Sequence, residues 1–258
     1  ELLSSEQAVL YVGPRPAKEV AAVLSKHFPL AETLSPPSTF EPLRSIAPEK
    51  TQIHFYEKEM AQAQVRLELA VGERNESSMP AAQLYNEYFA GGMAGLVFQE
   101  LREARALAYS AWGHYFPASR SDEENILVGY IGCQADKTIE AVDAFLGLLN
   151  EMPFNENRWE SAQDALESAY RTNHARFRQI PGAVYDWNQL GLTEDPRKAR
   201  FPVIQSADIE TLRRFYQKEI KPRAKLISIV GDSSKIDLDA LAKFGPITKI
   251  TKEQIFTY

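Results

Sequence analysis

The chain has 258 residues, of which 44% are hydrophobic and 25% charged, a composition ordinary for a globular protein. The net charge is −6, and the basic residues are scattered instead of gathered in a stripe, which argues against a nucleic-acid surface. No apolar run approaches the ~18 residues of a membrane-spanning helix. At about 150 residues per domain, the length predicts one or two domains.

Residues 1–30 predict a buried strand, a glycine turn and a short helix. The strand, AVLYVG, ends at Gly13, and the helix, KEVAAVLSKHF, has apolar residues at helical spacing. The same order returns near the C-terminus, where KLISIVG ends at Gly231 and SKIDLDALAKF follows. Because the second copy closes a domain, we expect residues 1–30 to be a βα unit that closes a preceding domain. The chain begins with Glu1 in place of Met, so we expect it to be part of a longer protein.

Residues 31–50 predict a linker between that unit and the main domain. They combine mixed polar residues with the prolines Pro36, Pro37, Pro42 and Pro48. Proline-rich polar segments form spacers more readily than packed elements. The main domain is therefore expected to cover residues 51–258.

Two pairs of strands are predicted within the main domain. IHFY (residues 53–56) and the alternating VRLELA (residues 65–70) are predicted as two strands joined by a turn. The second pair is LAYSAWGHYF (residues 107–116) and NILVGYIGC (residues 125–133). LISIV (residues 226–230) is predicted as the last strand.

Helices are predicted between and after these strands. One begins at Pro80, where the missing proline N–H costs nothing, and ends at Gly91, where a second helix opens. Further helices are predicted at residues 139–149, from 155 to about 178, and at 208–216. Strand pairs close in sequence, with helices between them, predict an α+β fold: a two-layer sandwich whose antiparallel sheet is covered on one side by helices.

The stretch GGMAGLVFQELREARALAY (residues 91–109) carries the most specific pattern. Two glycines break a helix, and Arg102 lies near the end of the next helix, seven residues before Tyr109 at the start of a strand. This arrangement resembles the C-terminal, non-zinc half of insulinase/pitrilysin-type zinc peptidases (inverzincins), which are related to mitochondrial processing peptidase. The residues that match that family are Gly91, Gly92, Met93, Leu96, Phe98, Glu100, Leu101, Arg102, Glu103, Leu107, Ala108 and Tyr109.

The zinc motif of these enzymes, H-x-x-E-H, is missing from this chain. The four histidines, His27, His54, His114 and His174, are too far apart in sequence to form it. Where the resemblance would place the motif, the helix reads Leu84-Tyr-Asn-Glu87-Tyr88, and neither Leu84 nor Tyr88 is a zinc ligand. We therefore expect no metal site here, no peptidase activity from this chain alone, and zinc in a partner half.

The resemblance implies roles for Arg102 and Tyr109. In that family this pair reaches across to a peptide held at the zinc of the other half. The Tyr109 hydroxyl is then expected to donate to the scissile carbonyl oxygen as negative charge develops there, and Arg102 to hold a nearby carbonyl. The expected partners are a zinc-binding peptidase half, on the same or a separate chain, and a peptide enclosed between the halves.

Structural interpretations of the same residues stay open. An arginine near a helix C-terminus is favoured by the helix dipole, and a tyrosine at a strand start is commonly a half-buried packing residue. Two other protein classes also stay open: a structural or assembly subunit of the same fold without a proteolytic role, and an unrelated α+β binding module. The C-terminal FGPITKITKEQIFTY is similar to the tail of large bacterial family members that are often exported, which favours the periplasm or cell envelope.

Overall fold

The structure is a computed structural model that describes residues 4–28, 31, 33–36, 41, 44–45, 47–103 and 108–256. The chain divides into two compact units. The first comprises Glu1–Leu43 and His174–Asp195, and the second comprises Arg44–Asn173 and Pro196–Tyr258. No helix of the described ranges is both long enough and apolar enough to cross a membrane.

The first unit contains helix α1 (Ala17–His27), the short helix η6 (Phe177–Gln179) and helix α5 (Ile180–Gln189). The helix expected after Gly13 is present as α1, but no strand forms at Val9–Val12, and Val9 is 60% exposed. A strand needs a neighbouring strand to satisfy its backbone groups, and the described residues offer this segment none. The division into residues 1–30, 31–50 and 51–258 stays a prediction, and part of the expected linker lies outside the described residues.

The second unit is built on a six-stranded sheet in the order β3-β4-β2-β5-β1-β6. The strands are β1 (Gln52–Glu57), β2 (Gln62–Glu73), β3 (Ser110–Phe116), β4 (Glu124–Gln134), β5 (Leu226–Gly231) and β6 (Ile247–Lys249). The pairs β3/β4, β4/β2 and β2/β5 are antiparallel, as predicted. The predicted α+β fold is confirmed, and the sheet is mixed, because β1 runs parallel to both β5 and β6.

The predicted pairing of β1 with β2 is wrong, because β5 lies between them. Strands two positions apart in a sheet are about 10 Å apart. The residues between Glu57 and Gln62 are numerous enough to span that distance, since each covers up to ~3.5 Å. The Lys58 N–H donates to the Gly231 carbonyl at 2.9 Å, which starts the crossing over the end of β5.

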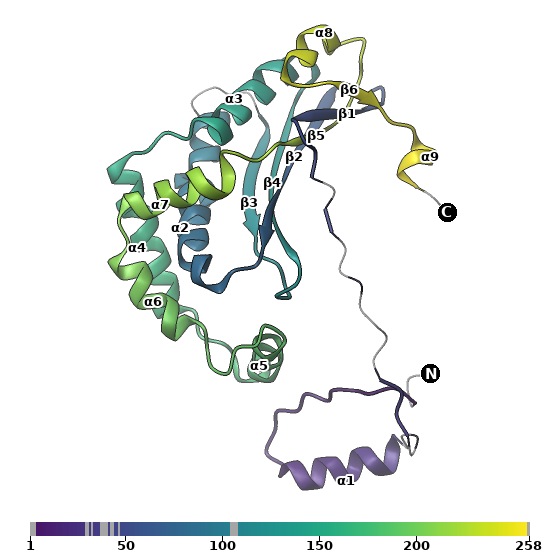
Figure 1. Cartoon of the computed structure of the whole chain (residues 1–258), viewed down its shortest axis with the longest axis vertical. Coiled ribbons are helices and arrows are strands. Elements are labelled where there is room, and N and C mark those ends of the chain that lie inside the picture. Colours follow the sequence, from purple (N-terminus) through teal and green to yellow (C-terminus); the bar gives the residue numbers. More distant parts are fainter. Residues whose placement is uncertain are drawn as a thin grey trace. The chain divides into compact units, whose positions relative to one another are not determined.

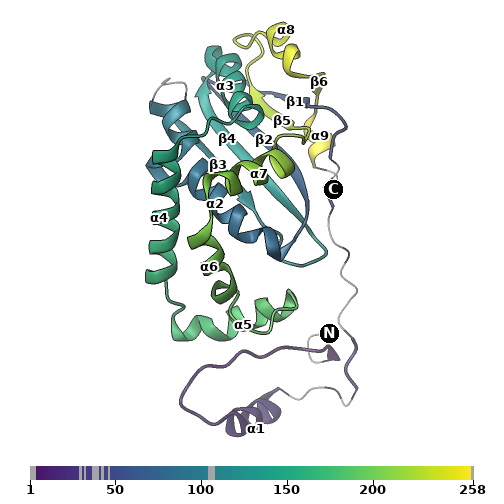
Figure 2. The same ribbon diagram turned by 60° about the vertical axis from the view of Figure 1, so that its left-hand side comes forward.

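Helices cover one face of this sheet, as predicted (Figures 1 and 2). The longer ones are α2 (Met79–Ala90), α3 (Thr138–Asn150), α4 (Glu156–Thr172), α6 (Arg197–Ser206) and α7 (Ile209–Phe215). The shorter ones are η2 (Glu76–Ser78), η3 (Gly92–Ala94), η4 (Phe98–Glu103), η5 (Ala135–Lys137), η7 (Tyr216–Ile220), α8 (Leu238–Leu241) and η8 (Ala242–Phe244). Helix α9 (Lys252–Ile255) lies beside β1 on the opposite face of the sheet, where its residues and His54 line one groove. The helix expected to reach about residue 178 ends at Thr172, because Asn173 has an extended backbone.

The core lies between the sheet and the helices α2, α3, α4 and α7. In β2, the fully buried Val65 and Leu67 alternate with the exposed Gln64 and Arg66, so successive side chains point to opposite faces. From α2, Tyr85 and Phe89 stack with ring centroids 5.0 Å apart and fill the centre. The opposite face of the sheet carries polar and aromatic side chains.

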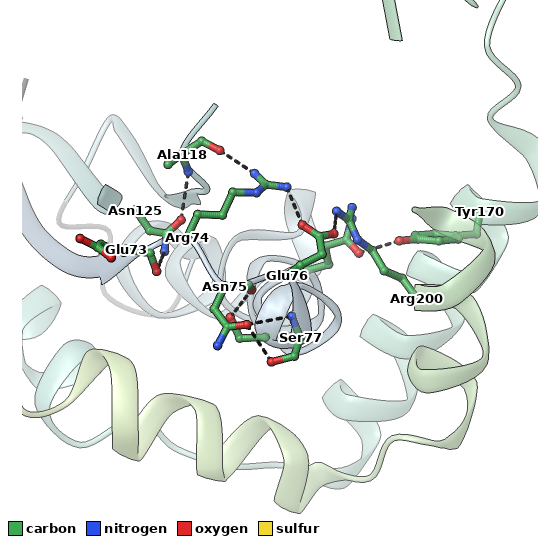
Figure 3. A network of polar contacts seen from close by, with 11 residues as sticks. Glu73, Arg74, Asn75, Glu76, Ser77, Ala118, Asn125, Tyr170 and Arg200 are labelled. Carbon is green, nitrogen blue, oxygen red and sulfur yellow. Dashed lines mark hydrogen bonds and ion pairs between the residues drawn. The ribbon is translucent and has the colours of Figure 1, made fainter. Parts of the chain in front are cut away.

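A polar network closes one end of the core (Figure 3). Arg74, which follows β2, donates to the Ala118 carbonyl and pairs with Glu76 at 3.1 Å. Arg200 of α6 pairs with the same Glu76 carboxylate. The side chains of Arg74 and Arg200 are only 10% and 13% exposed. Glu76 therefore joins the end of β2, the loop after β3 and helix α6.

Candidate functional site

The candidate site begins where α2 ends and η4 follows. The Gly91 N–H closes α2 on the Glu87 carbonyl at 3.0 Å, and Gly92 then takes a positive φ of 56°. Gly95 passes so close to Gly91 that a Cβ on Gly95 would lie 2.6 Å from the Gly91 nitrogen. Glycine allows both the positive φ at Gly92 and the close approach at Gly95 without steric cost. The chain can therefore turn sharply between α2 and η4.

Arg102 lies in the last turn of η4, whose backbone has the wider π-helical hydrogen-bonding pattern. Its guanidinium carbon lies 4.9 Å from the centre of the Phe98 ring. Among the described residues, its ion-pair partner is Glu103 at 4.0 Å, a separation at which an exposed pair contributes little. The Arg102 side chain is 51% exposed, so its planar set of donors stands open to a ligand.

Tyr109 lies at the start of β3, and its side chain is 82% exposed. Its backbone N–H donates to the Gly132 carbonyl at 2.9 Å, although the strand register places Ser110 opposite Gly132. The Tyr109 N–H therefore adds one backbone hydrogen bond to β4 just before β3 begins. No side chain of the described residues accepts or donates a hydrogen bond at the Tyr109 hydroxyl. Leu107, a matching residue two positions before Tyr109, lies outside the described residues.

The positions at which the resemblance would place a zinc motif do not fit a metal ion. Leu84 is fully buried and has no donor atom. The Tyr88 hydroxyl donates to the Pro153 carbonyl at 2.8 Å and accepts from the Asn155 N–H at 2.9 Å. Its hydrogen bonds therefore hold neighbouring backbone segments together. Glu87 keeps a carboxyl whose pKa is raised by burial, but it has no companion ligand. Within the described ranges, no three His, Cys, Asp or Glu side chains lie close enough to hold a metal.

The segment His54-Phe-Tyr-Glu57-Lys58 also departs from H-x-x-E-H, since Lys58 stands where the second histidine would be. It forms strand β1 and the turn after it, and a Glu57 carboxylate oxygen accepts the Ser233 N–H at 3.0 Å. Hydrogen bonds from the side chain and the backbone of Ser233 lower the pKa of Glu57. Two grooves of roughly 470 and 380 Å³ border His54 on the sheet face opposite the core, and neither is lined by Arg102 or Tyr109. The candidate pair therefore lies on open surface, away from these two cavities.

Sequence reasoning missed an aromatic pair beside Tyr109. Trp112 of β3 stacks on Tyr130 of β4, with ring centroids 5.9 Å apart, and Trp112 is 43% exposed. Trp112 and Ser110 share one face of β3, since alternate residues of a strand do. The alternation of Trp112, His114 and Phe116 in the sequence was a signal for this exposed aromatic row. His114 is half-buried, and burial lowers the pKa of its imidazole.

Together these features define an α+β domain that presents an exposed arginine and tyrosine and, among the residues that the structure describes, no cluster of metal ligands. A family model described as the peptidase M16 inactive domain matches residues 3–166, which include both side chains. The chain belongs to this family, which confirms the resemblance to the non-zinc half of insulinase/pitrilysin-type peptidases.

Solved structures with the same fold support this assignment. One is a peptidase M16 inactive domain from Pseudomonas fluorescens, with 18% identity, a TM-score of 0.66, and coverage of 86% of this chain and 51% of that one. A conserved protein from Enterococcus faecalis has 15% identity, a TM-score of 0.66 and the same coverage. A protease from Helicobacter pylori has 14% identity, a TM-score of 0.63, and coverage of 84% of this chain and 53% of that one. The chain thus spans about half the length of these structures. No curated protein matches the chain.

Proposed function

We propose that this chain is the non-catalytic half of a zinc endopeptidase that closes over the zinc half and contributes substrate contacts. The observation that carries the proposal is the exposed Tyr109 hydroxyl. A tyrosine at the start of a core strand is ordinarily half-buried, yet this one is 82% exposed. Exposed tyrosine of this kind is enriched where proteins meet their ligands.

The Tyr109 hydroxyl has the chemistry to stabilise a developing oxyanion. A hydroxyl donates one hydrogen bond, and the bond strengthens as the carbonyl oxygen that accepts it becomes negative during attack on the peptide. Enclosure between two halves excludes water and raises the strength of that bond. This chain then stabilises charge on the peptide, while the attacking group belongs to the other half.

Arg102 has the chemistry to position the peptide. Its planar guanidinium presents donors in a fixed geometry that suits a carbonyl or a carboxylate. The Phe98 ring beneath it restrains the side chain without occupying its donors. We assign Arg102 to the placement of a substrate carbonyl near the bond that is cut.

We place the metal in the partner half, because the donor set of this chain does not fit one. A zinc ion there supplies Lewis-acid chemistry when bound. None of the roles assigned to Tyr109 and Arg102 requires a metal ligand in this chain. The pairing with a catalytic half is what membership of an inactive-domain family implies.

We also propose that residues 1–30 complete a preceding domain. Helix α1 has no buried residue, and Val9, Leu10 and Tyr11 are exposed. Apolar residues in both segments support packing against further protein. Limited proteolysis tests the division: cleavage is expected first between residues 31 and 50, since exposed linkers are cut before packed elements.

The decisive experiment is reconstitution with a zinc-containing half. The chain alone is expected to hold zinc no more tightly than stray surface histidines and to leave a flexible peptide uncut. Adding the zinc half should produce activity that depends on Tyr109. Stoichiometric zinc on this chain after dialysis against a weak chelator contradicts the proposal. Assembly with full activity for the Tyr109→Phe variant favours a purely structural subunit instead.

A further inference from the structure

β3 is an edge strand, and one of its residues already has its outer backbone groups occupied (Figure 1). The Tyr115 N–H donates to Asn86 Oδ1 at 2.8 Å, and Asn86 Nδ2 donates to the Tyr115 carbonyl at 2.9 Å. Asn86 lies on α2, so a single amide side chain takes the place of a neighbouring strand. These bonds also show that the N–H and C=O of Tyr115 point away from β4.

The orientation of Tyr115 determines which other backbone groups point outward. In an antiparallel pair, every second residue directs its N–H and C=O away from its partner strand. Gly113 and Ala111 therefore point to the same side as Tyr115. Gly113 is buried beneath Phe89, since a Cβ at Gly113 would lie 2.7 Å from the Phe89 ring. Ala111 is half-buried, and no described residue is bonded to its outward groups.

The open position at Ala111 lies next to the candidate substrate contacts. Tyr109 is two residues away, and the stacked rings of Trp112 and Tyr130 lie on the adjoining uncovered face. A backbone donor and acceptor thus stand beside an exposed aromatic surface. That combination meets the needs of an extended chain, which offers backbone groups along its edge and side chains to alternate faces.

We propose that the edge of β3 at Ala111 binds an extended peptide segment by β-strand addition, with an apolar peptide side chain resting on Trp112 and Tyr130. The inference rests on the proposed function, because the peptide would be substrate held beside Tyr109. The occupant is a single flexible segment and not the sheet edge of a folded partner. Asn86 and the burial of Gly113 leave only one residue of β3 with open outward backbone groups. The edge strand of a folded partner would need several such residues in succession.

Amide exchange measured by NMR on the whole chain tests this binding mode. The probe is a peptide of about ten residues that alternates leucine with serine and carries terminal lysines for solubility. Exchange at the Ala111 amide should slow about tenfold at saturating peptide, while the Tyr115 amide, already bonded to Asn86, should change little. The same peptide N-methylated at every residue lacks donors on both edges, and its methyl groups obstruct strand pairing, so it should not protect Ala111.

Variants separate backbone pairing from side-chain contact. Ala111→Pro removes the outward N–H at an edge position, where proline is tolerated, and should abolish peptide binding while thermal unfolding confirms the fold. Trp112→Ala should weaken binding of the probe peptide, but exchange of the Ala111 amide should still slow when the peptide is in excess. Binding of the probe with no change in Ala111 exchange overturns the proposal, as does equal binding by Ala111→Pro.

The two proposals fail in different ways. Protection of Ala111 in a chain whose Tyr109→Phe variant keeps full kcat in the reconstituted enzyme supports edge binding and contradicts the oxyanion role. Loss of kcat in that variant without protection of Ala111 supports the oxyanion role and contradicts edge binding.

Discussion

The Tyr109 N–H donates to the Gly132 carbonyl at 2.9 Å, one residue before β3 begins at Ser110. Strict alternation continued backward from β3 would place Tyr109 on the face of Gly113 and Tyr115, which is the core face. Tyr109 is instead 82% exposed and lies just outside the strand. The alternation of β3 therefore does not extend to this tyrosine.

The Tyr109→Phe variant should lower kcat of the reconstituted enzyme by roughly 10²-fold, the usual loss for one oxyanion donor. The free energy of unfolding should change by less than about 1 kcal/mol, because the hydroxyl contacts solvent in this chain. Steady-state kinetics and denaturant unfolding measure the two effects. Tyr185→Phe, which removes the hydroxyl of another exposed tyrosine, is the matched control and should leave kcat unchanged.

The Arg102→Lys variant keeps the positive charge but loses the planar fork. We expect KM to rise and kcat to fall, because a point charge holds a carbonyl less rigidly. Arg171→Lys is a suitable control, since Arg171 also lies over a phenylalanine, Phe201, at 5.1 Å and pairs with Glu167. If both variants change the kinetics equally, the effect is a general one of charge geometry and not a substrate contact of Arg102.

The Glu76→Gln variant should destabilise the second unit. It leaves Arg74 and Arg200 largely buried without their shared counter-charge, a change that costs several kcal/mol in full burial. Glu76 itself is partly exposed, so we expect about 2 kcal/mol in denaturant unfolding. Glu140→Gln breaks an exposed pair with Lys137 and should cost less than about 0.5 kcal/mol. Equal losses in the two variants would show that the network carries no special stability.

Asp232 should make stability depend on pH in acid. Hydrogen bonds from Lys235 and Ser234 lower its pKa from an ordinary 3.8 to about 2. Because the folded pKa is depressed, the stabilisation is present above the unfolded pKa and is lost as pH falls from about 4 through about 2. Asp232→Asn should lack this component in unfolding curves measured across that range. If the variant loses stability between about pH 4 and about pH 2 as the parent chain does, Asp232 is not the cause of that loss.

The family and most elements of the second unit could be predicted from the sequence, whereas α5, α6 and β6 were not predicted and the strand expected at Val9–Val12 does not form. The glycines from Gly91 to Gly95, the spacing of Arg102 and Tyr109, and the alternation in β2 are local patterns, and local patterns report local conformation and which face is buried. The absence of the H-x-x-E-H motif could also be read from the sequence, because zinc ligands are particular residue types. These local patterns can be recognised without knowing how distant parts of the chain pack.

Tertiary structure alone decided which strands are neighbours and how the candidate site is presented. β5 enters between β1 and β2 from more than a hundred residues away in sequence, and no local pattern encodes such a distant partner. The backbone hydrogen bond of Tyr109 depends on Gly132, and the closure of the β3 edge at Tyr115 depends on Asn86 of another element. Hydrogen bonds between distant segments set these features, because backbone groups must find partners wherever the packed elements bring them.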